Sequence, residues 1–150
     1  MTSTPPDADA GELPPAMPMA STHPDPVARE AFNRMYAERA QRAAQRPAIE
    51  EAGRAALGRL YQVAKRDTGQ ARRVASFLLG LYNGNRFLFD LTDFRCLDAE
   101  VFDDCLAVLR MDYQPRQEVH NYFLNGGQKF EKLAEDWRLV DRLKDGTQAP

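Results

Sequence analysis

The chain has 150 residues, of which 43% are hydrophobic and 28% charged, and its formal net charge at pH 7 is −2. This length gives room for one domain, and the near-neutral balance excludes a uniformly basic nucleic-acid-binding protein. No apolar run approaches the roughly 20 residues of a transmembrane helix, so we expect no membrane span.

The charge is unevenly distributed along the chain. Residues 1–27 carry −4, residues 28–95 carry +6 and residues 96–150 carry −4. A basic middle segment beside an acidic end indicates either an anionic partner or pairing between the two segments. Of the two, we favour pairing within the chain.

The first 27 residues contain seven of the ten prolines and show no apolar period. Such a segment cannot bury enough apolar surface to offset its loss of backbone entropy, so residues 1–27 are expected to form a disordered acidic tail. It lacks the basic start and unbroken apolar core of a signal peptide. With Cys96 and Cys105 expected as reduced thiols, the sequence predicts a cytoplasmic protein.

Residues 28–47 predict a solvated helix or linker. Asp25 is expected to cap it, Pro26 to occupy its first position and Pro47 to end it. Its apolar residues cover only the first half of the helix; they are Phe32, Met35 and Tyr36.

A helical domain is expected over residues 48–143. Its first helix, to Lys65, carries apolar residues at three- and four-residue spacing: Ile49, Ala52, Ala56, Leu57, Leu60, Tyr61 and Ala64. The next helix is expected to begin at Asp67 or Thr68 and to stop at Gly84. Residues 86–91 then predict a short extended segment, and residues 92–95 a capped single turn.

Three further helices complete the expected domain. Asp98 caps one of them, Pro115 opens another that ends at Asn125-Gly126-Gly127, and the last fades after Leu143. The buried face of the last helix is formed by Phe130, Leu133, Ala134 and Trp137. We therefore predict an all-α fold, a compact bundle of about five helices, with residues 144–150 as a disordered end.

The expected helix start after Lys65 is a candidate anion-binding site. A helix N-terminus leaves N–H groups free and carries about half a positive charge. The candidate residues for a phosphate or nucleic acid are Arg66, Thr68, Gly69, Arg72 and Arg73. Pairing of these arginines with Asp67, or with an acidic side chain of the helix capped by Asp98 or of the last helix, is the alternative, and we favour it. The glycine spacing and lysine of a P-loop are absent.

The corner at residues 111–118 is a candidate partner-binding surface, through Tyr113 and Arg116. The alternative is a proline-initiated helix corner with no binding role. His120 is the one histidine outside the tail and lacks a nucleophile beside it. The spacings of Cys96, Cys105 and His120 match no zinc pattern. We therefore expect no catalytic residue, no metal and no cofactor.

Several motifs resemble an uncharacterised family of small bacterial proteins found on plasmids and integrative conjugative elements of proteobacteria. They are Arg66-Asp67-Thr68-Gly69-Gln70, Phe77-Leu78-Leu79-Gly80-Leu81-Tyr82-Asn83-Gly84, Phe89-Asp90-Leu91-Thr92-Asp93, Val108-Leu109-Arg110-Met111-Asp112-Tyr113 and Asn125-Gly126-Gly127. The resemblance covers roughly Leu57 to Trp137. It implies a cytoplasmic accessory protein of a mobile element and brings no activity or site residue with it.

The sequence favours a small helical binding or regulatory protein that acts by contact with another protein, without catalysis. One alternative is direct binding of nucleic acid through the basic residues between 39 and 73, which are Arg39, Arg42, Arg46, Arg54, Arg59, Lys65, Arg66, Arg72 and Arg73. A second alternative is phosphate or nucleotide sensing at Thr68. The oligomeric state is left open.

Overall fold

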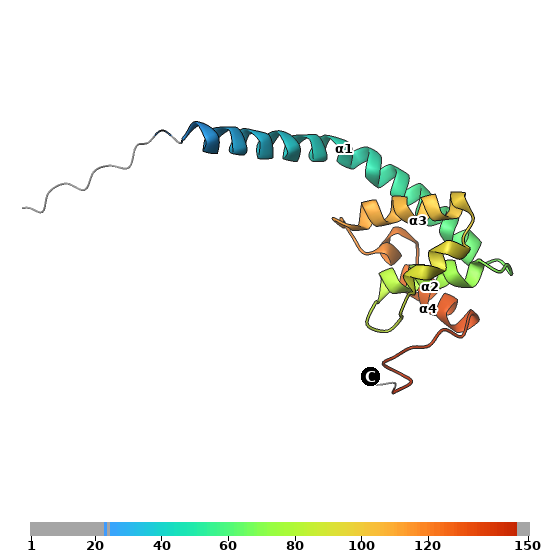
Figure 1. Cartoon of the computed structure of the whole chain (residues 1–150). Helices are drawn as coiled ribbons and strands as arrows, with labels where there is room; N and C mark the ends of the chain where they lie inside the picture. Colours follow the sequence, from blue (N-terminus) through green and yellow to red (C-terminus); the bar gives the residue numbers. More distant parts are fainter. Residues whose placement is uncertain (1–22, 24, 147–150) are drawn as a thin grey trace, which may run out of the picture. The chain divides into compact units, whose positions relative to one another are not determined.

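The computed structural model describes residue 23 and residues 25–146, and it forms helices joined by loops (Figure 1). The helices, in chain order, are α1 (Pro26–Ala64), α2 (Ala71–Tyr82), η1 (Leu91–Cys96), α3 (Ala99–Asp112), η2 (Val119–Tyr122) and α4 (Gly126–Asp136), where η marks a 3₁₀ helix. Within the described residues there is no strand, so the predicted all-α bundle is confirmed. Nearly all of the tail expected at residues 1–27 lies outside the described residues.

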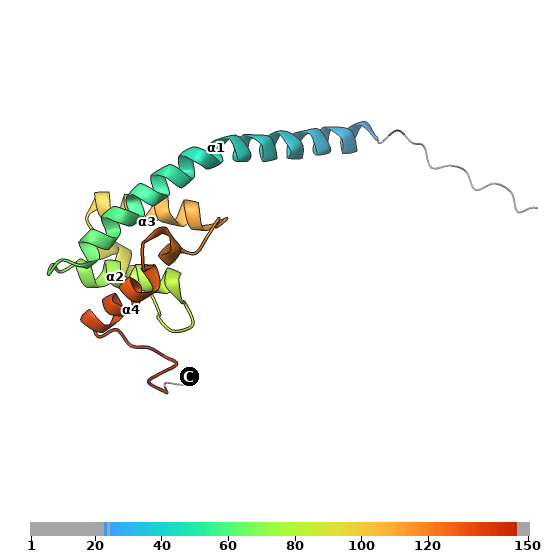
Figure 2. The same ribbon diagram turned by 180° about the vertical axis from the view of Figure 1, so that it is seen from behind.

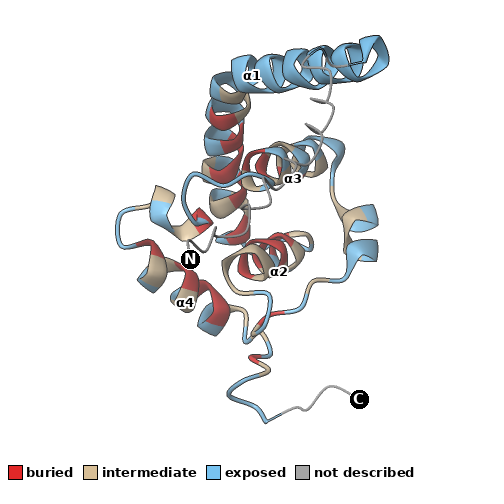
Figure 3. Ribbon diagram, turned by 90° about the vertical axis from the view of Figure 1, so that its left-hand side faces the viewer, coloured by how far each residue is buried: buried red, intermediate tan, exposed pale blue. Residues whose placement is uncertain are grey.

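The chain divides into two units, residues 1–41 and residues 42–150. In the first unit, every described residue is exposed, and residues 26–41 form the beginning of α1. Figure 3 shows this part of α1 in the colour of exposed residues throughout. The second unit holds all the buried residues that form the core.

The expected break at Pro47 is wrong, because α1 runs through this residue without interruption. A proline inside a helix lacks an N–H and so removes one hydrogen bond to the carbonyl four residues earlier, here that of Ala43. The residues after Pro47 are anchored by packing, with Ala56, Leu57 and Leu60 almost completely buried. The apolar stripe expected for residues 48–65 therefore exists, but it belongs to the second half of α1.

The helix expected to begin at Asp67 or Thr68 begins instead at Ala71. Gln70 explains the late start, because its side chain donates to Asp98 Oδ2 at 2.9 Å and accepts from the Asp98 N–H at 3.0 Å. These bonds connect the turn before α2 to the start of α3. At the other end, Asn83 is the C-cap in an extended conformation, and Gly84 follows it without a left-handed φ.

The predicted capped turn at residues 92–95 is confirmed as part of η1, where the Asp90 carboxylate accepts from the Thr92 N–H at 2.8 Å. The helix expected from Pro115 is wrong, since only the short η2 forms there. Asn125-Gly126-Gly127 also begins α4 rather than ending a helix. Gly126 lies so close to η2 that an added Cβ would be 1.6 Å from the His120 carbonyl oxygen.

The core of the second unit surrounds α2, which lies beside α4 and η2 (Figures 1 and 2). Phe130 of α4 is fully buried, and its ring lies 5.4 Å from that of Tyr82 and 5.7 Å from that of Phe123. The predicted buried face of the last helix is confirmed at Phe130, Leu133 and Ala134. Figure 3 shows buried residues on both α2 and α4.

Arg86 connects the loop after α2 to the C-terminal segment. Its guanidinium binds Asp141 Oδ2 at 2.8 Å and also pairs with both carboxylate oxygens of Glu131 on α4. The Tyr82 hydroxyl donates to the same Glu131 at 3.0 Å. The pKa of Arg86 is raised by these bonds, and those of Glu131 and Asp141 are lowered by their bonds to Arg86.

Candidate functional site

The turn between α1 and α2 contains the first part of the anion site predicted from the sequence. Thr68 and Gly69 are exposed there, and Thr68 is not the N-cap, a position that Gln70 occupies. Arg66 and Thr68 line a hollow of about 490 Å³ whose other charged residues include Arg59, Asp98 and Asp104. Because acids and bases both line this hollow, its charge does not specifically favour an anion.

Two of the three arginines of the predicted site, Arg72 and Arg73, contact other parts of the chain. Arg72 Nη1 donates to the Trp137 carbonyl at 2.7 Å. Arg73 Nε lies 3.3 Å from Asp93 Oδ1, and its Nη1 donates to the Gly69 carbonyl at 3.1 Å. The structure therefore gives each guanidinium an internal partner, and anion binding at this turn stays a prediction.

Other basic residues between 39 and 73 also have internal contacts. Arg59 makes a two-bond pair with Asp104, at 2.8 and 3.0 Å. Arg46 donates to the carbonyls of Met111 and Gln114, and the Arg54 guanidinium lies 5.7 Å from the centre of the Tyr122 ring. Pairing within the chain, favoured from the charge pattern, thus occurs at Arg59–Asp104.

The predicted partner-binding corner is held against α1. Arg116 Nη1 lies 3.5 Å from Oε1 of Glu50, which is only 8% exposed. Arg46, Glu50 and Arg116 line one hollow of about 470 Å³. Tyr113 does not line that hollow, and its side chain is 80% exposed. Tyr113 and Arg116 are thus both exposed, and their role in binding a partner stays a prediction.

His120 and Cys105 occupy ordinary packing positions, whereas Cys96 does not. The His120 ring lies edge-on to Tyr82 at 5.0 Å, and its buried Nδ1 has no hydrogen-bond partner among the described residues. Cys105 is fully buried, and burial raises the pKa of its thiol to about 12. Cys96 is exposed. Within the described part of the chain, no group of three or more histidines, cysteines or acids is arranged to hold a metal ion.

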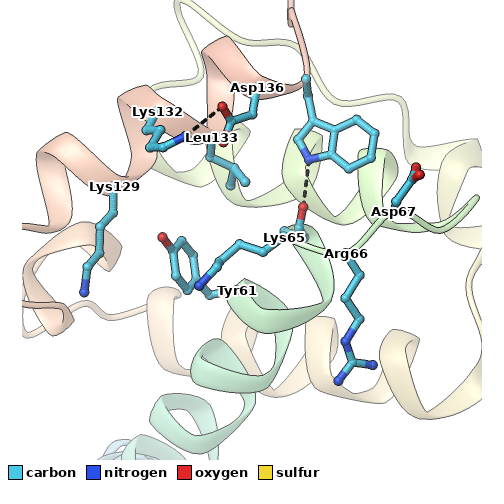
Figure 4. A pocket seen from close by; sticks show the side chains of 10 residues that line it. Tyr61, Lys65, Arg66, Asp67, Lys129, Lys132, Leu133 and Asp136 are labelled. Carbon is cyan, nitrogen blue, oxygen red and sulfur yellow. Dashed lines mark hydrogen bonds and ion pairs between the residues drawn. The ribbon is translucent and has the colours of Figure 1, made fainter.

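A third hollow, of whose residues only Arg66 was among the candidates for the predicted anion site, lies where the ends of α1 and α4 meet (Figure 4). It has a volume of about 450 Å³ and four basic side chains, Lys65, Arg66, Lys129 and Lys132. Two acids line it as well, and one of them, Asp136, binds Lys132 at 2.9 Å. The remaining wall is formed by Tyr61, Leu133 and Trp137.

This basic hollow is assembled from two separate helical faces. Tyr61 lies in the last turn of α1 and Lys65 directly follows this helix, while Lys129 and Lys132 are three positions apart on one face of α4. Trp137 holds the two helix ends together, because its Nε1 donates to the Ala64 carbonyl at 2.7 Å. Each pair alone is typical of a solvated surface, which is why the hollow could not be predicted from the sequence.

Within the described residues, no helix is long and apolar enough to cross a membrane. The described residues form a small all-α protein whose hollows are lined largely by charged side chains. Residues 54–138, just over half of the chain, match a family of unknown function, DUF7673, and the protein belongs to this family. The match contains all the residues of the basic hollow and none of residues 26–53. No curated protein and no solved structure matches the chain.

Proposed function

We propose that this protein is a non-catalytic binding protein that acts by contact with another protein, through the part of α1 at residues 26–41. The observation that carries the proposal is the exposure of three large apolar side chains in this segment. Phe32 is 61% exposed, Met35 51% and Tyr36 68%. Large apolar groups that gather on one exposed face mark interaction surfaces in soluble proteins.

The spacing of these residues defines the contact surface. Met35 and Tyr36 follow Phe32 by three and four positions, so all three lie on one face of α1. Arg39 lies on the same face, four positions after Met35. Burying each apolar side chain against a partner would contribute about 1.5–3 kcal/mol. A partner protein with an apolar groove and an acidic residue beside that groove would fit this helix face.

Two observations disfavour direct nucleic-acid binding as the main function. Arg59 and Arg73 are paired with Asp104 and Asp93, so neither is available to a phosphate without breaking an existing contact. In the exposed segment at residues 26–41, the Phe32, Met35 and Tyr36 face is largely apolar, with Arg29 and Arg39 as its basic neighbours. Nucleic-acid binding is driven by the release of counterions from the phosphates, which requires clustered, unpaired cationic side chains on the protein.

The proposed setting is the bacterial cytoplasm, where the protein would act as a regulatory accessory of a plasmid or integrative conjugative element. This part of the proposal rests on the motifs that resemble proteins of such elements, among them Arg66-Asp67-Thr68-Gly69-Gln70. In this setting the partner is a protein of the host or of the element that belongs to a nucleoprotein machine.

The test compares the full chain with a variant that replaces the three apolar residues, Phe32→Ser/Met35→Ser/Tyr36→Ser. A photo-crosslinking residue at Ala31, beside Phe32, would capture the partner in cells of the native host, and mass spectrometry would identify it. We expect one partner whose purified form binds the full chain and loses binding to the triple variant. The control is Leu88→Ser/Leu124→Ser, which removes two side chains that are 67% and 82% exposed elsewhere.

Equal binding of the partner by the triple variant and the control would contradict the proposal. If light scattering shows that the purified protein is a dimer, the partner is a second copy of this chain. In that case the same triple substitution should convert the dimer to a monomer. An all-α circular dichroism spectrum shows that each variant retains the fold.

A further inference from the structure

Two lysine ammonium groups beside the basic hollow rest on aromatic rings. Lys65 Nζ lies 5.2 Å from the centre of the Tyr61 ring, and Lys129 Nζ lies 5.9 Å from the centre of the Phe123 ring. The two rings are neighbours, with their centres 5.0 Å apart. In the part of the chain that the structure describes, neither lysine forms an ion pair. Lys65 directly follows α1 and Lys129 lies on α4, and both reach the surroundings of the same tyrosine (Figure 4).

The acids of the hollow leave these two charges largely uncompensated. Asp136 is occupied by Lys132, with both carboxylate oxygens at 2.9 Å from Nζ. Asp67 lies on the side of the hollow opposite Lys129 (Figure 4). The carbonyl of Ala64, at the negative end of α1, already accepts from the Trp137 indole. An anion placed near Tyr61 would therefore meet ammonium groups first.

We propose that this hollow binds a phosphate group, held by the ammonium groups of Lys65 and Lys129 and by the Tyr61 hydroxyl. Hydrogen bonds between an ammonium and a phosphate are among the stronger ones in proteins, while a cation over an exposed ring is held weakly. Each lysine can therefore turn from its ring to the anion. Burial raises the pKa of Tyr61 above its ordinary value, so its phenol stays protonated and can donate.

The size of the hollow indicates that the phosphate belongs to a larger molecule. A volume of about 450 Å³ lies within the range of small-molecule sites and exceeds what one phosphate fills. Leu133 and Trp137 offer apolar surface to the group that carries the phosphate. A free nucleotide and the backbone of a nucleic acid both present this chemistry. The site is separate from Thr68 and from the α1 surface proposed above.

The test is a nuclear magnetic resonance titration of the full chain with inorganic phosphate, adenosine monophosphate and a short single-stranded oligonucleotide, each used separately. We expect shifts to concentrate in residues 61–67 and 129–137. Lys65→Gln/Lys129→Gln should weaken binding of the active probe by about tenfold or more, because it removes two charged hydrogen-bond donors. Arg95→Gln/Arg110→Gln removes the same charge from exposed positions outside the hollow and should leave the affinity unchanged.

If phosphate or the nucleotide binds the original chain and binds the lysine variant more weakly, the ligand is a small phosphorylated molecule. Binding of the oligonucleotide alone with the same loss would identify a nucleic-acid backbone, and both results support the site. No binding of any probe overturns the proposal, as does equal weakening by the two double variants. Tyr61→Phe keeps the ring and removes one hydrogen-bond donor, so its loss of affinity should be smaller than that of the lysine variant. This substitution tests the site even if the lysine variant does not fold.

Discussion

The indole Nε1 of Trp137 donates a hydrogen bond of 2.7 Å to the carbonyl oxygen of Ala64, the last residue of α1. The last carbonyls of a helix have no partner within it, so this bond satisfies one of them from outside. It also joins the residue that follows α4 to the end of a helix more than seventy positions earlier. The two ends that it joins form the wall of the basic hollow.

Replacing Trp137 by phenylalanine should lower the free energy of unfolding by about 0.5–1.5 kcal/mol, the net contribution of one such hydrogen bond, plus a smaller loss of packing. Urea denaturation followed by circular dichroism measures this, since the substitution removes the one tryptophan and with it the fluorescence signal. An unchanged midpoint would mean that the bond contributes nothing to stability.

Two adjacent glycines at the start of α4 should respond oppositely to alanine. A Cβ at Gly126 would lie 1.6 Å from the His120 carbonyl oxygen, so the backbone of η2 must move, and we expect a loss of about 1–3 kcal/mol or more. Gly127 has nothing within 4 Å of an added Cβ. Gly127→Ala should be neutral or stabilising by up to about 1 kcal/mol, because alanine favours the helix. Thermal melts of the two variants under one condition provide the comparison, and similar midpoints would contradict it.

The glycines of α1 provide a second matched pair. A Cβ at Gly53 would lie 2.4 Å from Cβ of Met111 on α3, whereas one at Gly58 meets nothing within 4 Å. Gly53→Ala should cost about 1–3 kcal/mol by forcing the two helices apart, and Gly58→Ala should gain about 0.5–1 kcal/mol. Combining Gly53→Ala with Met111→Ala should cost less than the sum of the two single substitutions, because the smaller side chain relieves the clash. Additive losses would show that the contact is not tight.

These close approaches explain which parts of the fold the sequence could predict. The faces of Leu57, Leu60 and Phe130 repeat with the helical period, so they were predicted from local pattern alone. Asn125-Gly126-Gly127 has the composition of a helix end, and the sequence does not reveal that His120 lies against Gly126. The same limit applies to Gln70, whose bonds to Asp98 delay the start of α2. Contacts between residues distant in the chain decided each of these positions.

The candidate site shows a similar division. The arginines after Thr68 were identified from their place near a helix start. Arg73 pairs within the chain, but its partner is Asp93 of η1, which was not among the acids expected for this pairing. The basic hollow could not be predicted, because Lys65 and Lys129 come together only through the packing of α1 on α4. A lysine near an exposed helix end can be solvated or can bind a ligand, and the sequence pattern is the same in both cases.

The two cysteines should differ sharply in reactivity. Burial raises the pKa of the Cys105 thiol to about 12, so at pH 8 it holds almost no thiolate, the reactive form, and reagents cannot reach it. Cys96 is exposed on η1. An alkylating reagent at pH 8 should modify one thiol per folded chain and two in denaturant, and Cys96→Ser should abolish the first reaction. Rapid modification of both thiols in the folded protein would contradict the buried position of Cys105.

The bonds from Arg86 to Asp141 and Glu131 should make stability depend on pH in the acid range. Hydrogen bonds to Arg86 lower the pKa of both carboxyl groups from their ordinary values of 3.8 and 4.5. A carboxyl group with a depressed folded-state pKa contributes its full stability above the unfolded-state value, and this is lost as the pH falls through the folded-state value. Urea midpoints should therefore be constant from pH 7 to about pH 5 and decline steadily below it.

Asp141→Asn tests this origin of the acid sensitivity. The variant should be less stable than the original chain at pH 7, because Arg86 loses one of its two acidic partners. The difference should shrink as the pH falls below about 4, since protonation of Asp141 in the original chain removes the same charge. Asp103→Asn is the control, because this exposed acid forms no ion pair among the described residues. A stability difference for Asp141→Asn that stays the same from pH 7 to pH 3 would show that the effect comes from packing and not from the charge on Asp141.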